Sequence, residues 1–259
     1  MNEKLIITPS INRVTQLVRD CIALEALGAI VGPPGTGKTT ALLAIESRYP
    51  SLGLPGRPFY YRCCAIQGPA RGVKDILVAL GLRESLLPMA LTLQMAIKAA
   101  LRELRNQEIR VILADEADSW SLESLQGVVT LMDVCKQKGQ PVALILTGCR
   151  DLPQWIGGLG SAMSRTLRCE YFYELSVELA LSVLRELGAP FAKLCEQVEQ
   201  GDKDAVGIIK HIHKTTRGNW RRLWYFSQLF LMQEGATEVT MERVKAAFER
   251  MTLEKTGNA

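Results

Sequence analysis

The sequence predicts an α/β core, with a parallel sheet covered by helices on both faces, followed by a small all-α part. Two observations predict the core: apolar segments alternate with segments of helical spacing, and each apolar segment is apolar throughout, as in strands buried on both faces. A third observation predicts the all-α part, because strand signals fade after about residue 174. We therefore expect an α/β core at 1–174 and a helical lid subdomain at 175–259.

The expected core elements follow in order along the chain. Residues 28–32 form a short β-branched strand that enters a glycine loop, and the helix-forming stretch 41–46 comes next. The other predicted strands are 58–63, 110–116, 141–147 and a short one at 170–173. The other predicted core helices are 73–80, which closes at Gly81, 91–105, and 121–136, which begins after the N-cap Ser121. A glycine-rich turn is expected at 68–72.

The lid is predicted from helical spacing interrupted by glycines at 188, 201, 218 and 235. The expected helices are 176–187, 190–199, 204–215, 220–234 and 240–252.

The composition of the 259 residues excludes several classes of protein. A hydrophobic fraction of 47% is too high for a disordered chain, and no apolar run approaches the ~20 residues that span a bilayer. The 7 cysteines form no CxxC pair and there are 2 histidines, so no zinc-site spacing exists. We expect reduced cysteines in a cytoplasmic protein without a membrane partner. The net charge of +4 permits a nucleic-acid partner but does not argue for one.

The segment Gly32-x-x-x-x-Gly37-Lys38-Thr39 matches a phosphate-binding loop at every defined position. Its backbone N–H groups and the positive end of the following helix attract phosphate. Lys38 is expected to neutralise β and γ oxygens, and the Thr39 hydroxyl to bind magnesium. The expected nucleotide-binding residues are Gly32, Pro33, Pro34, Gly35, Thr36, Gly37, Lys38, Thr39 and Thr40.

Two adjacent carboxylates, Asp115 and Glu116, end an apolar strand about 75 residues after the loop. We expect Asp115 to hold magnesium through water and Glu116 to polarise the water that attacks the γ-phosphate. The adjacent glutamate favours hydrolysis over passive binding. The next strand brings Thr147 and Cys149 to one side by strand alternation. Either could face the γ-phosphate, and core packing of Thr147 with an inert Cys149 thiol stays an equal alternative.

Arginines occur at two further places. Arg165 and Arg168 precede the last short strand, where an arginine fork could reach a neighbouring subunit's nucleotide; plain solvation is the alternative. Arg221 and Arg222 lie at a predicted helix start in the lid, and one of them could reach the γ-phosphate.

In this order and spacing, these motifs make the chain resemble an AAA+ ATPase over roughly residues 10–250. The motifs are Gly32–Thr39, Asp115-Glu116, Thr147-Gly148-Cys149, Arg165 and Gly218-x-x-Arg221-Arg222-Leu223. Within that superfamily the chain most resembles the ATP-dependent regulators of DNA transposition, the MuB, TnsC and IstB group. Three features support this: the glycine-proline turn and basic helix at 67–75, the extended acidic motif Asp115-Glu116-Ala117-Asp118, and the size.

The resemblance implies ATP and Mg²⁺ as cofactors, with catalytic roles for Lys38 and Glu116. It also implies Arg165 as a trans-acting arginine finger, Arg168 as second choice, and Arg221 as lid sensor. Members of the group polymerise around duplex DNA, and the matching DNA-contact positions here are Lys74, Arg71 and Thr92. Such backbone contacts are sequence-tolerant and salt-sensitive. The family's polar sensor aligns with Cys149 and not with Thr147; a thiol is a poor partner for phosphate, so either hydrolysis is slow or Thr147 substitutes.

The leading hypothesis is therefore an ATP-dependent oligomer that assembles on duplex DNA and recruits or stimulates a transposase. ATP would bridge subunits, and hydrolysis would disassemble them. One alternative is a different AAA+ machine, such as a helicase loader or a secretion-associated ATPase. The other is a nucleotide-controlled protein scaffold that binds no DNA.

Overall fold

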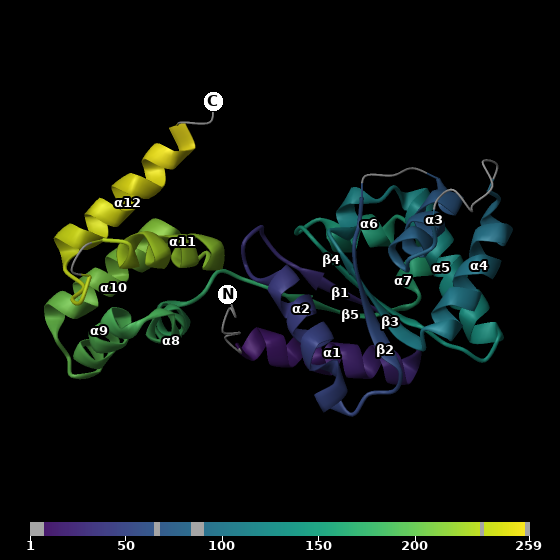
Figure 1. The fold of residues 1–259 in the computed structure, drawn as a ribbon, viewed down its shortest axis with the longest axis horizontal. Helices are drawn as coiled ribbons and strands as arrows, with labels where there is room; N and C mark the ends of the chain where they lie inside the picture. Colours follow the sequence, from purple (N-terminus) through teal and green to yellow (C-terminus); the bar gives the residue numbers. More distant parts are fainter. Residues whose placement is uncertain (1–7, 65–67, 84–90, 234–235, 257–259) are drawn as a thin grey trace. The chain divides into compact units, whose positions relative to one another are not determined.

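The computed structural model describes residues 8–64, 68–83, 91–233 and 236–256 (Figure 1). The chain divides into two compact units. The sheet unit contains residues 8–32 and Lys38–Phe172. The helical unit contains the described residues from Tyr173 onward together with the loop Pro33–Gly37.

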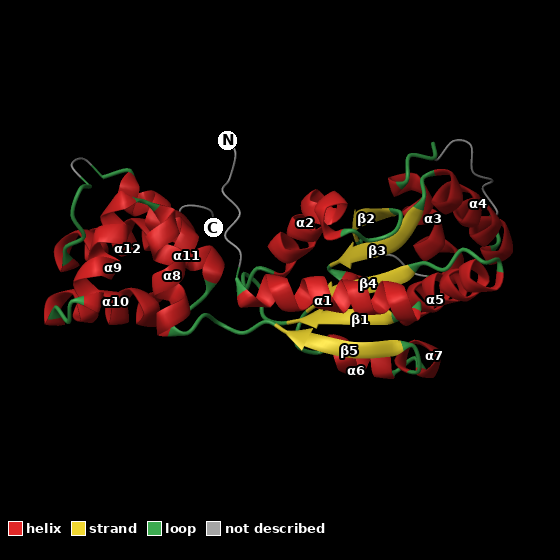
Figure 2. Cartoon of the chain, turned by 90° about the horizontal axis from the view of Figure 1, so that it is seen from below, coloured by secondary structure: helices red, strands yellow, loops and turns green. Residues whose placement is uncertain are grey.

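Within the described residues the sheet has five strands in the order β2-β3-β4-β1-β5, and every neighbouring pair is parallel. This architecture confirms the predicted α/β class with a parallel sheet. The strands, which the arrows of Figure 2 show, are β1 (Leu27–Val31), β2 (Arg57–Arg62), β3 (Ile109–Asp115), β4 (Ala143–Gly148) and β5 (Thr166–Tyr171). The prediction that the fourth strand lies beside the acid-bearing strand is confirmed, since β4 pairs with β3. The carboxyl ends of all strands meet at one edge, which is where ligands bind in such sheets.

Helices cover both faces of this sheet. The helices are α1 (Pro9–Leu24), α2 (Lys38–Arg48), α3 (Pro69–Ala79), α4 (Leu93–Asn106), α5 (Leu122–Gln137), α6 (Leu152–Gly157) and α7 (Gly160–Met163). Successive residues of β1 point to opposite faces of the sheet. Leu27, Ala29 and Val31 join the core formed with α3, α4 and α5. The intervening Gly28 faces α1, where an added Cβ would lie 2.9 Å from the Cys21 sulfur.

Several boundaries differ from the prediction. Helix α3 begins at Pro69, so the turn predicted at 68–72 is wrong beyond its first residue. The physical reason is packing: a Cβ on Gly72 would lie 2.8 Å from the Ser124 carbonyl oxygen, so this glycine allows α3 to approach α5 closely. Helix α1 and the short helices α6 and α7 were not predicted. Strand β5 begins at Thr166, four residues earlier than expected.

The second unit is all-helical, as predicted. Its helices are α8 (Val177–Leu187), α9 (Ala189–Glu199), α10 (Lys203–Thr216), α11 (Trp220–Leu231) and α12 (Met241–Thr256). Its core contains the fully buried Phe191, Phe226 and Phe230, and the ring centroids of Phe191 and Phe230 are 5.1 Å apart. None of the helices in the described residues combines the length and apolar character that a membrane span needs.

Candidate active site

The predicted phosphate-binding loop connects β1 to α2, which begins at Lys38. Gly35 and Gly37 have φ of 78° and 97°, in the left-handed region that favours glycine. The Thr36 hydroxyl donates a hydrogen bond to the Pro33 carbonyl at 2.9 Å, and the Lys38 ammonium donates one to the Gly32 carbonyl at 2.7 Å. The backbone thus forms the strand–loop–helix arrangement that binds phosphate in P-loop proteins.

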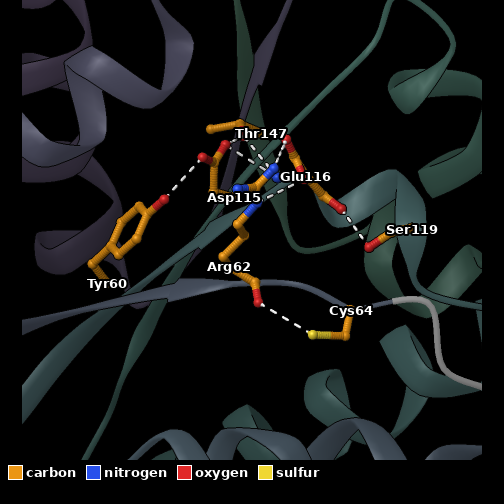
Figure 3. A network of polar contacts seen from close by, with 7 residues as sticks. All are labelled: Tyr60, Arg62, Cys64, Asp115, Glu116, Ser119 and Thr147. Atoms are coloured by element: carbon orange, nitrogen blue, oxygen red, sulfur yellow. Dashed lines mark hydrogen bonds and ion pairs between the residues drawn. The ribbon is translucent and has the colours of Figure 1, made fainter. Parts of the chain in front are cut away.

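The two acids lie at the carboxyl end of β3, the sheet edge at which β1 also ends. Asp115 is the last residue of β3 and is 2% exposed. One of its oxygens, Oδ1, accepts hydrogen bonds from the Thr147 hydroxyl and, at 3.1 Å, from the Glu116 backbone N–H. The other, Oδ2, accepts one from the Tyr60 hydroxyl at 3.0 Å (Figure 3). Burial, followed by the Asp115 charge, raises the pKa of Tyr60, so the phenol stays a donor at neutral pH.

Glu116 has a different environment. Its backbone is left-handed, with φ of 55°, and its side chain is exposed at the surface of the unit. Arg62, the last residue of β2, binds it with both arms of the guanidinium: Nε donates to Oε2 at 2.9 Å and Nη2 to Oε1 at 2.8 Å (Figure 3). The hydrogen bonds to Glu116, followed by its charge, raise the pKa of Arg62. The expected base is therefore held by a cation in this structure.

Thr147 and Cys149 have different partners. The fully buried Thr147 hydroxyl donates to Asp115 and accepts a hydrogen bond from the Glu116 N–H at 3.2 Å, so it contacts the acid pair directly. The Cys149 N–H donates to Asp118 Oδ2 at 3.0 Å. Burial, followed by a hydrogen bond with Asp118, raises the pKa of the Cys149 thiol and keeps it protonated at neutral pH. Of the two, only Thr147 has its side chain on the acid pair within the described contacts.

Tyr60 and Arg62 were missed by sequence reasoning. Both lie on β2, two residues apart and therefore on one face of the strand. The register Arg62↔Asp115 between β2 and β3 brings them to the acids. The sequence showed that Arg62 lies near the end of the predicted second strand. It did not show that this strand is the neighbour of β3, which is what brings Arg62 to the acids.

Both finger candidates are paired within the chain. Arg165 binds Asp133 of α5 with two arms, at 2.8 and 2.7 Å. Arg168 forms ion pairs with Asp20 at 3.0 Å and Glu170 at 3.2 Å. The Leu27 N–H donates to the Arg165 carbonyl at 3.0 Å, so Arg165 lies beside the beginning of β1. That is the opposite edge of the sheet from the acids, so Arg165 cannot serve the site of its own chain from this position.

The lid candidate Arg221 lies in the first turn of α11, in the unit that also contains Pro33–Gly37. Its backbone N–H donates to the Gly35 carbonyl at 3.1 Å, while its side chain is exposed. Asn219, the N-cap of α11, donates from its side-chain amide to the Pro34 carbonyl at 2.9 Å. Sequence reasoning did not single out Asn219, although asparagine before an apolar helical run is a typical N-cap signal.

The predicted DNA-contact residues lie on two helices of the sheet unit. Arg71 is exposed and Lys74 is half-buried, both on α3. Thr92 is the N-cap of α4, and its hydroxyl accepts a hydrogen bond from the Met95 N–H at 3.3 Å. The Thr92 side chain therefore already has a structural role.

The chemistry of the site fits magnesium. Mg²⁺ prefers oxygen ligands and takes only one or two from protein when phosphate is present. An ionised carboxylate has about four acceptor positions, and the Tyr60, Thr147 and Glu116 donors use three of those on Asp115. Among the described contacts an acceptor position of Asp115 remains for metal-bound water, and the exposed Thr39 at the start of α2 offers a hydroxyl.

Comparison with solved structures shows the same fold in proteins of low sequence identity. Orc1 of Aeropyrum pernix, solved in complex with DNA, is 17% identical with a TM-score of 0.62, over 96% of this chain and 66% of that chain. Cdc6p of Pyrobaculum aerophilum is 16% identical with a TM-score of 0.68, over 96% and 69%. The RuvB Holliday junction branch migration motor of Thermotoga maritima is 14% identical with a TM-score of 0.56, over 94% and 69%. This chain thus spans about two thirds of their length.

Comparison with curated protein sequences finds no match. Comparison with protein families matches residues 23–156, more than half of the chain, to the AAA domain. That range includes the phosphate-binding loop, the acid pair and Thr147. The chain therefore belongs to the AAA domain family and has the fold of an AAA+ P-loop NTPase, which implies nucleotide binding and, in general, hydrolysis.

Proposed function

We propose that this protein hydrolyses ATP, with Mg²⁺, to control its own assembly on duplex DNA. The observation that carries the proposal is the asymmetric acid pair: Asp115 is buried and fixed by hydroxyl groups, whereas Glu116 is exposed and held by Arg62. A fixed carboxylate suits metal binding, and an exposed one can reach a water molecule. Phosphoryl transfer to water uses one residue for each of these tasks.

Each residue then has one task. Lys38 and the backbone of the loop would neutralise the phosphates. Thr39 would bind the metal and Asp115 would hold it through water, and the metal would supply charge neutralisation. Thr147 keeps Asp115 and the Glu116 backbone in place. Glu116 polarises the attacking water after its carboxylate has left the two hydrogen bonds of the Arg62 guanidinium. Catalysis is mainly the placement of charge, so it depends on these contacts being formed together.

Assembly between copies is supported by the place of Arg165. It lies at the opposite sheet edge from the acids, so it would complete the site of a neighbouring copy. To do so the guanidinium must exchange Asp133 for the neighbour's γ-phosphate, which makes the contact depend on bound ATP. Arg168, with two carboxylate partners, is the weaker candidate. Arg221 would report the nucleotide state to the helical unit.

DNA association is supported by two observations. Arg71 and Lys74 place two cations on α3, and two proteins of like fold are the DNA-bound Orc1 and the RuvB branch migration motor. The motif pattern further supports a regulator of DNA transposition with a transposase as partner. The fold likeness to Orc1, Cdc6p and RuvB favours, about equally, another DNA-associated AAA+ ATPase as the second candidate.

The decisive experiment measures ATP turnover and assembly together, by phosphate release and by sedimentation, with and without duplex DNA. Wild-type protein is expected to form large assemblies with ATP and DNA, and to lose them as ATP is consumed. Lys38→Ala should lose nucleotide binding and assembly together. Glu116→Gln should bind ATP and remain assembled, because only the base is removed.

Three outcomes would contradict the proposal. ATP-dependent assembly by Lys38→Ala would remove the loop from the mechanism, and normal disassembly by Glu116→Gln would remove the base. Assembly that is equal with and without DNA would favour a nucleotide-controlled scaffold. Turnover stimulated by a transposase separates the transposition regulator from the second candidate.

A further inference from the structure

The edge strand β2 presents two side chains to the acid pair, one for each acid. Tyr60 and Arg62 lie on the same face of β2, and the register of β2 on β3 pairs Arg62 with Asp115. The Arg62 guanidinium binds Glu116, and the Tyr60 hydroxyl donates to Asp115 Oδ2 (Figure 3). Tyr61, on the other face, stacks on Phe59 and Trp120 in the core. One face of β2 therefore packs in the core through Tyr61, and the other face brings Tyr60 and Arg62 to the acids.

We propose that Tyr60 is a positioning residue for nucleotide-bound magnesium, acting through the carboxylate of Asp115. The inference rests on the proposed function, because it gives Tyr60 a task in the same site. Asp115 can turn about its Cβ–Cγ bond unless both oxygens are held. Thr147 and the Glu116 N–H hold Oδ1, and Tyr60 holds Oδ2.

Two properties suit Tyr60 to this role. The side chain is half-buried, so its hydrogen bond to the nearly inaccessible Asp115 competes little with water. Its aromatic ring has few rotatable bonds, so fixing it costs less conformational entropy than fixing a long polar side chain. The hydroxyl is thus a rigid donor aimed at one carboxylate oxygen.

Orientation of the carboxylate matters because Mg²⁺ demands near-ideal octahedral geometry. Residues that hold a metal ligand by hydrogen bonds typically change metal affinity by about 10- to 100-fold when they are removed. Nucleotide binding without metal depends instead on Lys38 and the loop. Loss of the Tyr60 hydroxyl should therefore weaken binding only in so far as binding depends on magnesium.

The test compares Tyr60→Phe with the matched control Tyr49→Phe. The Tyr49 hydroxyl donates to the Pro55 carbonyl at 3.0 Å, the same distance as in the Tyr60 bond. Tyr49 lies in the 3-10 helix Tyr49–Leu52, and this hydrogen bond goes to a backbone carbonyl and not to an acid. Binding of a fluorescent ATP analogue is titrated with MgCl₂ and repeated in EDTA. For Tyr60→Phe we expect the magnesium midpoint to rise about tenfold, with unchanged binding in EDTA. For Tyr49→Phe we expect both values to equal those of wild type.

Other results overturn the inference. An unchanged magnesium midpoint in Tyr60→Phe, or an equal shift in both variants, would show that the hydroxyl does not position Asp115. An equal loss of binding in EDTA would show a general structural role. If wild-type protein binds no nucleotide, the proposed function fails as well, whereas a normal wild-type magnesium dependence with an unaffected Tyr60→Phe refutes the Tyr60 assignment alone.

Discussion

Replacing Thr147 with valine removes one hydroxyl from the acid pair and keeps the branched shape of the side chain. Thr147 is fully buried and Asp115 is 2% exposed, so water cannot easily replace the lost donor. Hydrogen bonds to charged groups contribute about 1.5–3 kcal/mol. The Glu116 N–H still donates to Asp115 Oδ1 at 3.1 Å, so this oxygen keeps one partner. We therefore expect the free energy of unfolding of the sheet unit to fall by about 2 kcal/mol.

The same substitution should lower the rate of ATP hydrolysis, because the Asp115 carboxylate and the Glu116 backbone both lose a contact. Urea denaturation followed by tryptophan fluorescence gives the first quantity, and phosphate release gives the second. Thr147→Ser, which keeps the hydroxyl, should retain most of the activity. Cys149→Ala should also retain it, because the described hydrogen bonds of Cys149 with side chains go to Asp118 and not to the acid pair. Wild-type stability in Thr147→Val, or a larger loss of hydrolysis in Cys149→Ala, would refute this reasoning.

The remaining predictions concern two cations of the sheet unit. Arg62→Ala should raise the basal rate of ATP hydrolysis a few-fold, because the Arg62 guanidinium no longer holds Glu116. Phosphate release measures the rate, and Arg57→Ala at the other end of β2 is the control. A lowered rate would instead make Arg62 part of the catalytic arrangement. Lys74→Ala should weaken DNA binding equally for all sequences and reduce the slope of log affinity against log salt by about one. Fluorescence anisotropy across a salt series measures this slope, and the exposed Lys138→Ala serves as control. An unchanged slope would exclude a phosphate contact of Lys74.

The phosphate-binding loop and the acid pair could be predicted because their chemistry lies in contiguous residues. Gly32–Thr39 needs only a strand before it and a helix after it, and both were visible as local patterns. Tyr60, Arg62 and Asn219 could not be assigned in the same way. Their partners are about 55 and 185 residues away in the sequence, and the contacts follow from which strands are neighbours and which helix N-terminus meets the loop.

One local pattern led to a wrong prediction, the turn at 68–72, and another, the helical spacing of α1, was overlooked. Gly68 and Gly72 suggested a turn, but Gly72 lies inside α3. It permits the close approach of α3 to α5, because a side chain there would collide with the Ser124 carbonyl. A glycine needed for close packing cannot be told from a turn glycine without its neighbour. Helix α1 carried a usable signal, since its buried residues at 11, 14, 17, 18 and 21 have helical spacing and Pro9 suits a first turn.

The unequal exposure of the two acids explains how Asp115 can be fixed in place while Glu116 is held by Arg62 in an ion pair that opens easily. Asp115 is held by donors that water cannot displace, so its geometry is a permanent property of the fold. The pair of Arg62 and Glu116 is open to solvent, with side chains 67% and 51% exposed. Exposed ion pairs are weak because water and salt compete for both partners. The Glu116 carboxylate can therefore leave Arg62 at small cost, whereas Asp115 cannot leave Thr147 and Tyr60 without disrupting the core. Under the proposed function, this difference assigns control of hydrolysis to Glu116, the proposed base, and not to Asp115, the proposed metal-binding acid.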